Sequence, residues 1–168
     1  MPNYIRVINR AYWPDEEEIT KGYNIDNLGA NTITQDLRTK DNTLSLWAVE
    51  NTQDVVLAMV SNATKIDDIC TLKIDDEIIN DSGLEVKNET GNSRIKDLNE
   101  FHYNIKNLTY KKLADVSKVI IEALKDEDNL ETFTKKSIIK ILKKAIDDKR
   151  LDPKTLSKNI QKELEKAV

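Results

Sequence analysis

The spacing of apolar residues changes near residue 93, and this change limits the possible folds of the 168-residue chain most strongly. Before it, short segments rich in β-branched and aromatic residues predict strands. After it, apolar residues recur every three or four positions, which predicts helices. The first such set is Ile95, Leu98, His102 and Ile105. We therefore expect a sheet region over residues 1–92 and a helical region over residues 93–168.

The fold class predicted from these patterns is α+β, or a small α/β fold. Residues 44–49 read as a strand, 54–60 as a buried helix and 68–74 as another strand, which together predict a βαβ unit with parallel strands. With residues 4–8, and with 84–87 as a hairpin partner, the sheet is mixed and has three to four strands. Three to four helices follow, with N-caps expected at residues that include Thr109, Asp128 and Asp152.

Charge divides the chain in nearly the same place. Residues 1–100 hold 10 basic and 19 acidic side chains, whereas residues 101–168 hold 16 basic and 11 acidic ones. We expect an acidic α/β region and a basic helical region that packs on it or extends from it as an appendage. The opposite charges either face each other within the chain or face another molecule.

Composition excludes several kinds of site. One cysteine cannot form an intramolecular disulfide or a multi-thiolate zinc site, and one histidine excludes a site that needs two imidazoles. Four glycines leave no glycine-rich phosphate loop. No apolar run approaches the roughly 20 residues that span a bilayer. The first residues lack the basic-then-apolar layout of a secretory signal, so we expect a cytoplasmic protein without membrane contact.

One acidic pattern could hold a metal ion. Asp67 and Asp68 open a predicted strand, and Glu85 and Lys87 share one face of the next. This Asp…Glu-x-Lys arrangement resembles the pattern of the restriction-endonuclease-like nuclease superfamily. The resemblance implies Mg²⁺ held by Asp67, Asp68 and Glu85, with Asp68, Glu85 and Lys87 in catalytic roles. The alternative is the charged, solvated face of an edge hairpin.

The single histidine and the single cysteine are the other candidates for chemistry. His102 lies on the apolar face of its predicted helix and could act as a general base, or could simply bond a backbone carbonyl. Cys70 alternates with Leu72 and Ile74, which predicts a buried and inert thiol.

Basic side chains form two candidate partner-binding groups. Arg6 and Arg10 lie among aromatic residues near the N-terminus, and a lysine-rich helix lies in the second half. The helix contributes Lys136, Lys140, Lys143 and Lys144. Such a helix can bind an acidic protein or nucleic acid, or it can be a solvated face. The sequence pI of about 5.2 disfavours nucleic acid.

Together these features favour binding over catalysis. We expect a non-catalytic interaction or regulatory protein that contacts another protein or a second copy of itself. Accessory, inhibitor and immunity-type proteins of bacterial or phage systems are similar in class. No cofactor is expected, and Mg²⁺ enters only with the alternative of a metal-dependent nuclease. A nucleic-acid-binding module that uses the lysine-rich helix is the other alternative.

Overall fold

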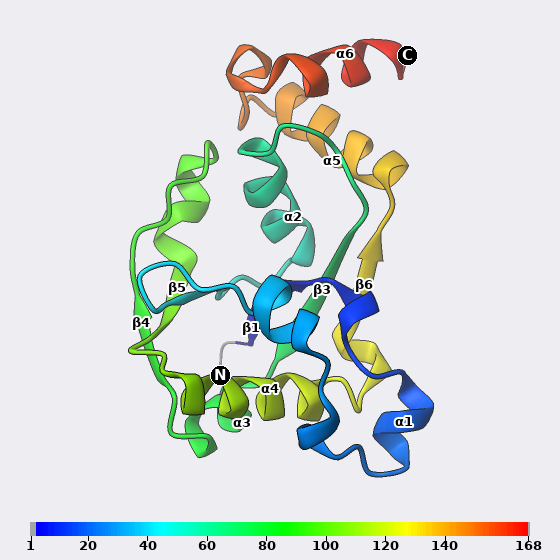
Figure 1. The fold of residues 1–168 in the computed structure, drawn as a ribbon. Helices are drawn as coiled ribbons and strands as arrows, with labels where there is room; N and C mark the ends of the chain where they lie inside the picture. Colours follow the sequence, from blue (N-terminus) through cyan, green and yellow to red (C-terminus); the bar gives the residue numbers. More distant parts are fainter. Residues whose placement is uncertain (1–2, 168) are drawn as a thin grey trace.

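The computed structural model describes residues 3–167, which form one six-stranded sheet with helices on both faces (Figure 1). The strands are β1 (Tyr4–Ile8), β2 (Leu44–Trp47), β3 (Ile69–Ile74), β4 (Glu85–Asn88), β5 (His102–Lys106) and β6 (Leu130–Phe133). The helices are α1 (Glu16–Thr20), α2 (Thr52–Ser61), α3 (Asp76–Asp81), α4 (Tyr110–Ala123), α5 (Lys135–Asp147) and α6 (Lys158–Lys166). The α+β class predicted from the sequence is therefore confirmed.

The sheet has the order β4-β5-β2-β1-β3-β6, and each neighbouring pair is antiparallel. The prediction of a mixed sheet with three to four strands is wrong on both points. The predicted βαβ unit is also wrong in that its two strands are not neighbours. Helix α2 connects β2 to β3, but β1 lies between these strands in the sheet. The N-terminal strand takes this central place because it carries apolar side chains on both faces, with Ile5 on one and Ile8 on the other.

The predicted hairpin between residues 68–74 and 84–87 does not form. Helix α3 follows β3, and β4 then pairs with β5 at the far edge of the sheet. The segment predicted as the first C-terminal helix is instead a 3₁₀ turn, Lys96–Phe101, followed by β5. Strand β5 pairs on both sides, with β4 and with β2, so its backbone hydrogen bonds are satisfied without a helix.

The third predicted helix starts later than its pattern suggests. Residues Leu130–Phe133 form β6, which pairs with β3, and α5 begins only after Thr134. The Thr134 side chain accepts a hydrogen bond from the backbone N–H of Ser137, which fixes the helix start. Both halves of the sequence therefore contribute strands to the same sheet.

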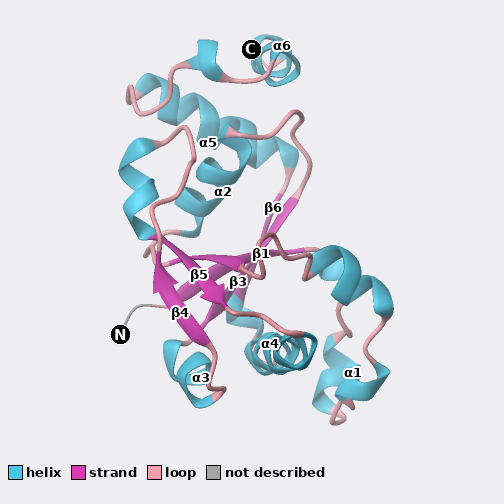
Figure 2. Cartoon of the chain, turned by 60° about the vertical axis from the view of Figure 1, so that its left-hand side comes forward, coloured by secondary structure: helices cyan, strands magenta, loops and turns pink. Residues whose placement is uncertain are grey.

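Helices α3 and α4 cover one face of the sheet, and α2 and α5 cover the other (Figure 2). On the α4 side, Leu46, Leu72 and Ile105 pack in one hydrophobic core. On the α2 side, Ile5 and Trp47 pack in a second core with the apolar residues of α2 and α5. Covering a sheet on both faces requires apolar side chains on both sides of its central strands, and β1 and β2 supply them apart from Arg6 and Ser45.

Helix α6 forms an outer layer against α5 (Figure 2). Ser157 caps α6, and the side chains of Leu156 and Ile160 are buried in the same core as α2 and α5. The apolar stripe of the last helix is therefore used inside the molecule. Over residues 3–167, no helix combines the length and the apolar character needed to cross a bilayer.

Candidate functional site

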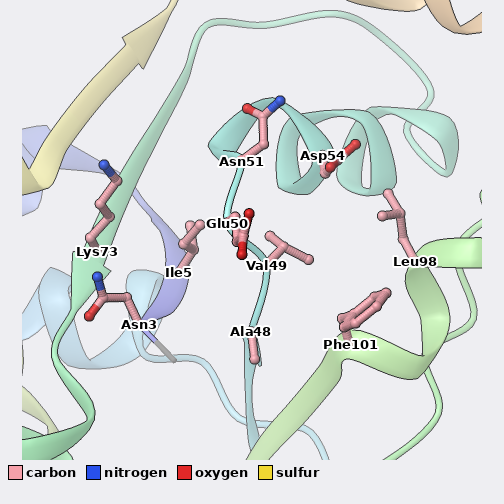
Figure 3. Close-up of a pocket in the computed structure, with 10 residues that line it drawn as sticks. All are labelled: Asn3, Ile5, Ala48, Val49, Glu50, Asn51, Asp54, Lys73, Leu98 and Phe101. Carbon is pink, nitrogen blue, oxygen red and sulfur yellow. The ribbon is translucent and has the colours of Figure 1, made fainter. Parts of the chain in front are cut away.

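An open cleft of about 910 Å³ lies beside the first turn of α2, and we call it the α2 cleft (Figure 3). Its walls come from β1, β3, the segment that joins β2 to α2, and the 3₁₀ turn Lys96–Phe101. Figure 3 shows the lining side chains from these separate parts of the chain. Such a concave surface is the usual place for a binding site.

Local interactions fix the walls of the α2 cleft. The side chain of Asn51 accepts a hydrogen bond from the backbone N–H of Gln53, which caps α2. The backbone N–H of Ala48 donates to the carbonyl of Phe101 over 2.9 Å and joins the segment before α2 to the 3₁₀ turn. These bonds hold Val49 and Phe101 on two sides of the same opening.

The floor of the α2 cleft is apolar. Ile5 and Leu98 are buried beneath it, and Val49 is half-buried. Phe101 remains 41% exposed although it lines the cleft. A partly exposed aromatic ring over an apolar floor offers contact area to an incoming apolar side chain, because burying that area removes it from water.

Charged groups stand at the rim of the α2 cleft. The guanidinium of Arg150 contacts the carboxylate of Asp54 over 3.0 Å and that of Asp97 over 2.9 Å. Partial burial works against the charge of Arg150, but these hydrogen bonds raise its pKa above the ordinary value. Asp54 is therefore already paired, whereas Glu50 is exposed and lines the opening together with Lys73.

The lining of the α2 cleft combines apolar side chains with two carboxylates, a lysine and two amides. Among the lining residues that the structure describes, none is a histidine, a cysteine or a serine. A Ser–His or Cys–His pair therefore has no members there. The cleft can hold an apolar group and place a cation beside Glu50.

The predicted metal-binding residues lie apart. Asp68 stands just before β3, whereas Glu85 and Lys87 are on β4 at the far edge of the sheet. Four strand-to-strand steps of about 4.8 Å separate β3 from β4, or roughly 19 Å. The structure does not bring these groups to one site.

Each of these charged residues has a local partner. The carboxylate of Asp68 accepts a hydrogen bond from the backbone N–H of Lys135 over 2.7 Å, at the start of α5. Asp67 pairs with Lys65, and Glu85 pairs with Lys87 over 2.8 Å. Over residues 3–167, the structure holds no group of three His, Cys, Asp or Glu side chains placed to bind a metal ion.

His102 is the first residue of β5 rather than part of a helix. Its Nδ1 lies 2.8 Å from the backbone carbonyl oxygen of Glu89, and its ring packs edge-to-face on Trp47 with 5.0 Å between centroids. Cys70 lies in β3 and is half-buried, and this burial raises the pKa of its thiol.

His102 also lines a second, more polar cleft of about 540 Å³, which we call the β5 cleft. Ser45 and Asn104 lie on the same sheet face as His102, because side chains alternate along β2 and β5. The carboxylate of Glu89 accepts hydrogen bonds from Asn104 and, over 2.6 Å, from Lys106. The bond to Lys106 and then the bond to Asn104 lower the pKa of Glu89.

The two predicted basic groups differ in exposure. The side chain of Arg6 is buried, and the guanidinium of Arg10 donates to the carbonyls of Trp13 and Pro14. On α5, Lys136 and Lys140 are exposed. Lys144 pairs with Asp148, and Lys143 donates to the carbonyl of Ala167 over 2.7 Å.

The sequence patterns singled out two residues of these clefts, Arg6 and His102, both in the lining of the β5 cleft. Phe101 and Glu50 were not singled out. A helix predicted over residues 93–105 gives no reason to place Phe101 beside the segment that follows residues 44–47. Glu89 and Asn104 were not singled out either, since their proximity depends on the pairing of β4 with β5. Comparison of the chain with family models, with curated proteins and with solved structures gives no match.

Proposed function

We propose that the chain is a non-catalytic interaction protein that binds another protein through the α2 cleft. The observation that carries the proposal is Phe101, which stays 41% exposed above the apolar floor of the α2 cleft. An accessory, inhibitor or immunity-type role is consistent with such a surface, because proteins of this kind act by occupying a partner.

The packing of the C-terminal helices supports the α2 cleft over the helical region as the contact surface. The apolar stripes of α5 and α6 are largely used against each other and against α2, with Ile138, Leu142 and Ile160 fully buried. Met59, Phe101 and Tyr110 are the large apolar side chains that remain exposed in the described part of the chain. Of these three, Phe101 lines the α2 cleft.

The rim predicts the chemistry of the partner. An apolar side chain fits against Phe101 and Val49, and a neighbouring Lys or Arg fits beside the exposed Glu50. The surrounding half of the chain is strongly acidic, which favours approach of a basic segment. We therefore propose a partner segment that presents an apolar residue next to a basic one.

A comparative capture experiment tests this function. The immobilised wild-type chain, Phe101→Ala and the control Tyr110→Ala are exposed to the same extract, and bound proteins are quantified. We expect a discrete protein to bind the wild type and Tyr110→Ala, and to bind Phe101→Ala about tenfold less. Glu50→Lys weakens the same binding, whereas Glu165→Lys on α6 leaves it unchanged. Thermal melts confirm that each variant is folded.

Two outcomes contradict the proposal. The first is a bound protein that is recovered equally by wild type and Phe101→Ala, since the cleft then makes no contact. The second is recovery of nucleic acid that depends on Lys140 and not on Phe101, which would favour the nucleic-acid-binding alternative. Strong salt dependence of that recovery would identify phosphate contacts.

A further inference from the structure

The β5 cleft concentrates positive charge within the acidic half of the fold. Four cationic side chains line it, against two acidic ones, Asp41 and Glu89. The cationic residues are Arg6, Arg38, Lys40 and Lys106. Residues 1–100 carry nearly twice as many acidic as basic side chains, so this local excess of positive charge is opposite to its surroundings.

Two of these cations have no acidic partner. Lys106 pairs with Glu89 over 2.6 Å, and that pair is neutral. Arg38 and Lys40 are exposed, and within residues 3–167 neither forms an ion pair. Their charges are therefore available to a ligand.

The third cation, Arg6, is buried in the wall of the cleft with 8% of its surface exposed. Strands β1 and β2 pair only through Ile5 and Trp47, so the carbonyl of Ser45 lacks a partner on β1. The guanidinium of Arg6 donates to this carbonyl over 3.0 Å and to the carbonyl of Asp36 over 2.8 Å.

The charge of Arg6 is only partly compensated. Both of its hydrogen-bond acceptors are neutral carbonyls, and among residues 3–167 its buried Nε has no hydrogen-bond partner. Burial lowers the pKa of Arg6, and the carboxylate of Asp36 offsets this in part. That carboxylate already accepts hydrogen bonds from the backbone N–H of Asn9 and from Nε1 of Trp13. A buried cation of this kind is stabilised by an anion nearby.

Two tight backbone features form the cleft around these charges. Asp41 and Asn42 have φ of 53° and 56°, which makes a hairpin turn that places Lys40 opposite Thr43. On the other side the chain passes close to β5 at Gly91. A Cβ at Gly91 would lie 3.0 Å from Oδ1 of Asn99 and 3.1 Å from Cβ of His102, so glycine allows this approach.

We propose that the β5 cleft binds a phosphate group, either free or as part of a small polar metabolite. Arg38 and Lys40 contact the phosphate oxygens, and Arg6 supplies positive potential from the wall. Asn104 and Ser45 are placed to hydrogen-bond polar groups carried by an ester. The site is independent of the α2 cleft and of its protein partner.

The single histidine gives a direct assay. The imidazole resonances of His102 are followed by NMR while inorganic phosphate is added at constant ionic strength. We expect a saturable shift, and an affinity about tenfold weaker in the double variant Arg38→Gln, Lys40→Gln. The variant Lys21→Gln, which removes an exposed lysine outside the cleft, is the control and keeps the wild-type affinity. Titration with ribose 5-phosphate distinguishes free phosphate from a phosphate ester as the ligand. A higher affinity for ribose 5-phosphate than for inorganic phosphate identifies an ester.

Three results would overturn the phosphate site. One is the absence of any saturable shift of the His102 signal with either probe. Another is an equal affinity in the wild type and in the folded double variant. The third is the same shift with chloride at matched ionic strength, which would show general screening of charge.

Discussion

Replacing Ile160 by alanine tests whether α6 is held on the body of the molecule. Ile160 is fully buried in the core that also contains Trp47, α2 and α5. The substitution removes three buried carbons, which at about 0.8 kcal/mol each gives roughly 2.4 kcal/mol of lost transfer free energy. The remaining cavity adds to this, so we expect about 3 kcal/mol of destabilisation.

Equilibrium unfolding in urea measures this change. For a slope near 2 kcal/mol per molar urea, the midpoint falls by about 1.5 M. Tryptophan fluorescence reports Trp47 in this core and Trp13 in the other, and circular dichroism reports the helices, so the two transitions should fall together. The control Lys162→Ala on the exposed side of α6 changes stability by less than about 0.5 kcal/mol.

A result for Ile160→Ala within the range of this control would refute the reasoning. It would mean that α6 is detached in solution and that its apolar stripe is free for a partner. The α2 cleft would then no longer be favoured over α6 as the contact surface.

Further substitutions test separate parts of the account. Arg150→Ala should lower the free energy of unfolding by about 1 kcal/mol in low salt and by less in 1 M NaCl, because salt screens the contacts of Arg150 to Asp54 and Asp97. If the wild type and the variant differ in urea midpoint by the same amount in both salt conditions, these ion pairs do not contribute to stability. Gly83→Ala should cost about 1 kcal/mol because Gly83 has φ of 68°, whereas Gly29→Ala should change little, and equal melting temperatures would contradict this. Because burial raises the pKa of Cys70, its alkylation by iodoacetamide should require a higher pH in the folded chain than in urea; coincident pH–rate curves would disprove it.

Local signals predicted the parts of the fold that depend on neighbouring residues. The strand over residues 4–8 and the helix capped by Thr109 form as expected, because alternation and capping act within a few residues. The helix predicted over the segment 93–106 was wrong, because the spacing of its apolar residues fits a helix and a turn followed by a strand equally well. The segment forms a strand because it pairs with β2 and β4, and these contacts are not visible in its local sequence.

The candidate sites depended even more on distant contacts. The Glu85 and Lys87 pair was correctly placed on one strand, but its distance from Asp68 depended on a strand order that local patterns do not contain. The α2 cleft joins residues near positions 5, 49, 73 and 101, so none of these segments shows it alone. Arg6 and Arg10 were noted for their charge, yet their hydrogen bonds to backbone carbonyls appear only in the folded chain.

The most direct test of the central claim is photo-cross-linking at the α2 cleft. A benzophenone amino acid at position 101 keeps an aromatic ring there, and the same residue at position 110 gives a matched control on another exposed aromatic site. In an extract, position 101 should yield one discrete cross-linked protein, with the attachment at an apolar residue beside a Lys or Arg. Absence of a cross-link at 101, or the same product at 110, would contradict binding through the α2 cleft.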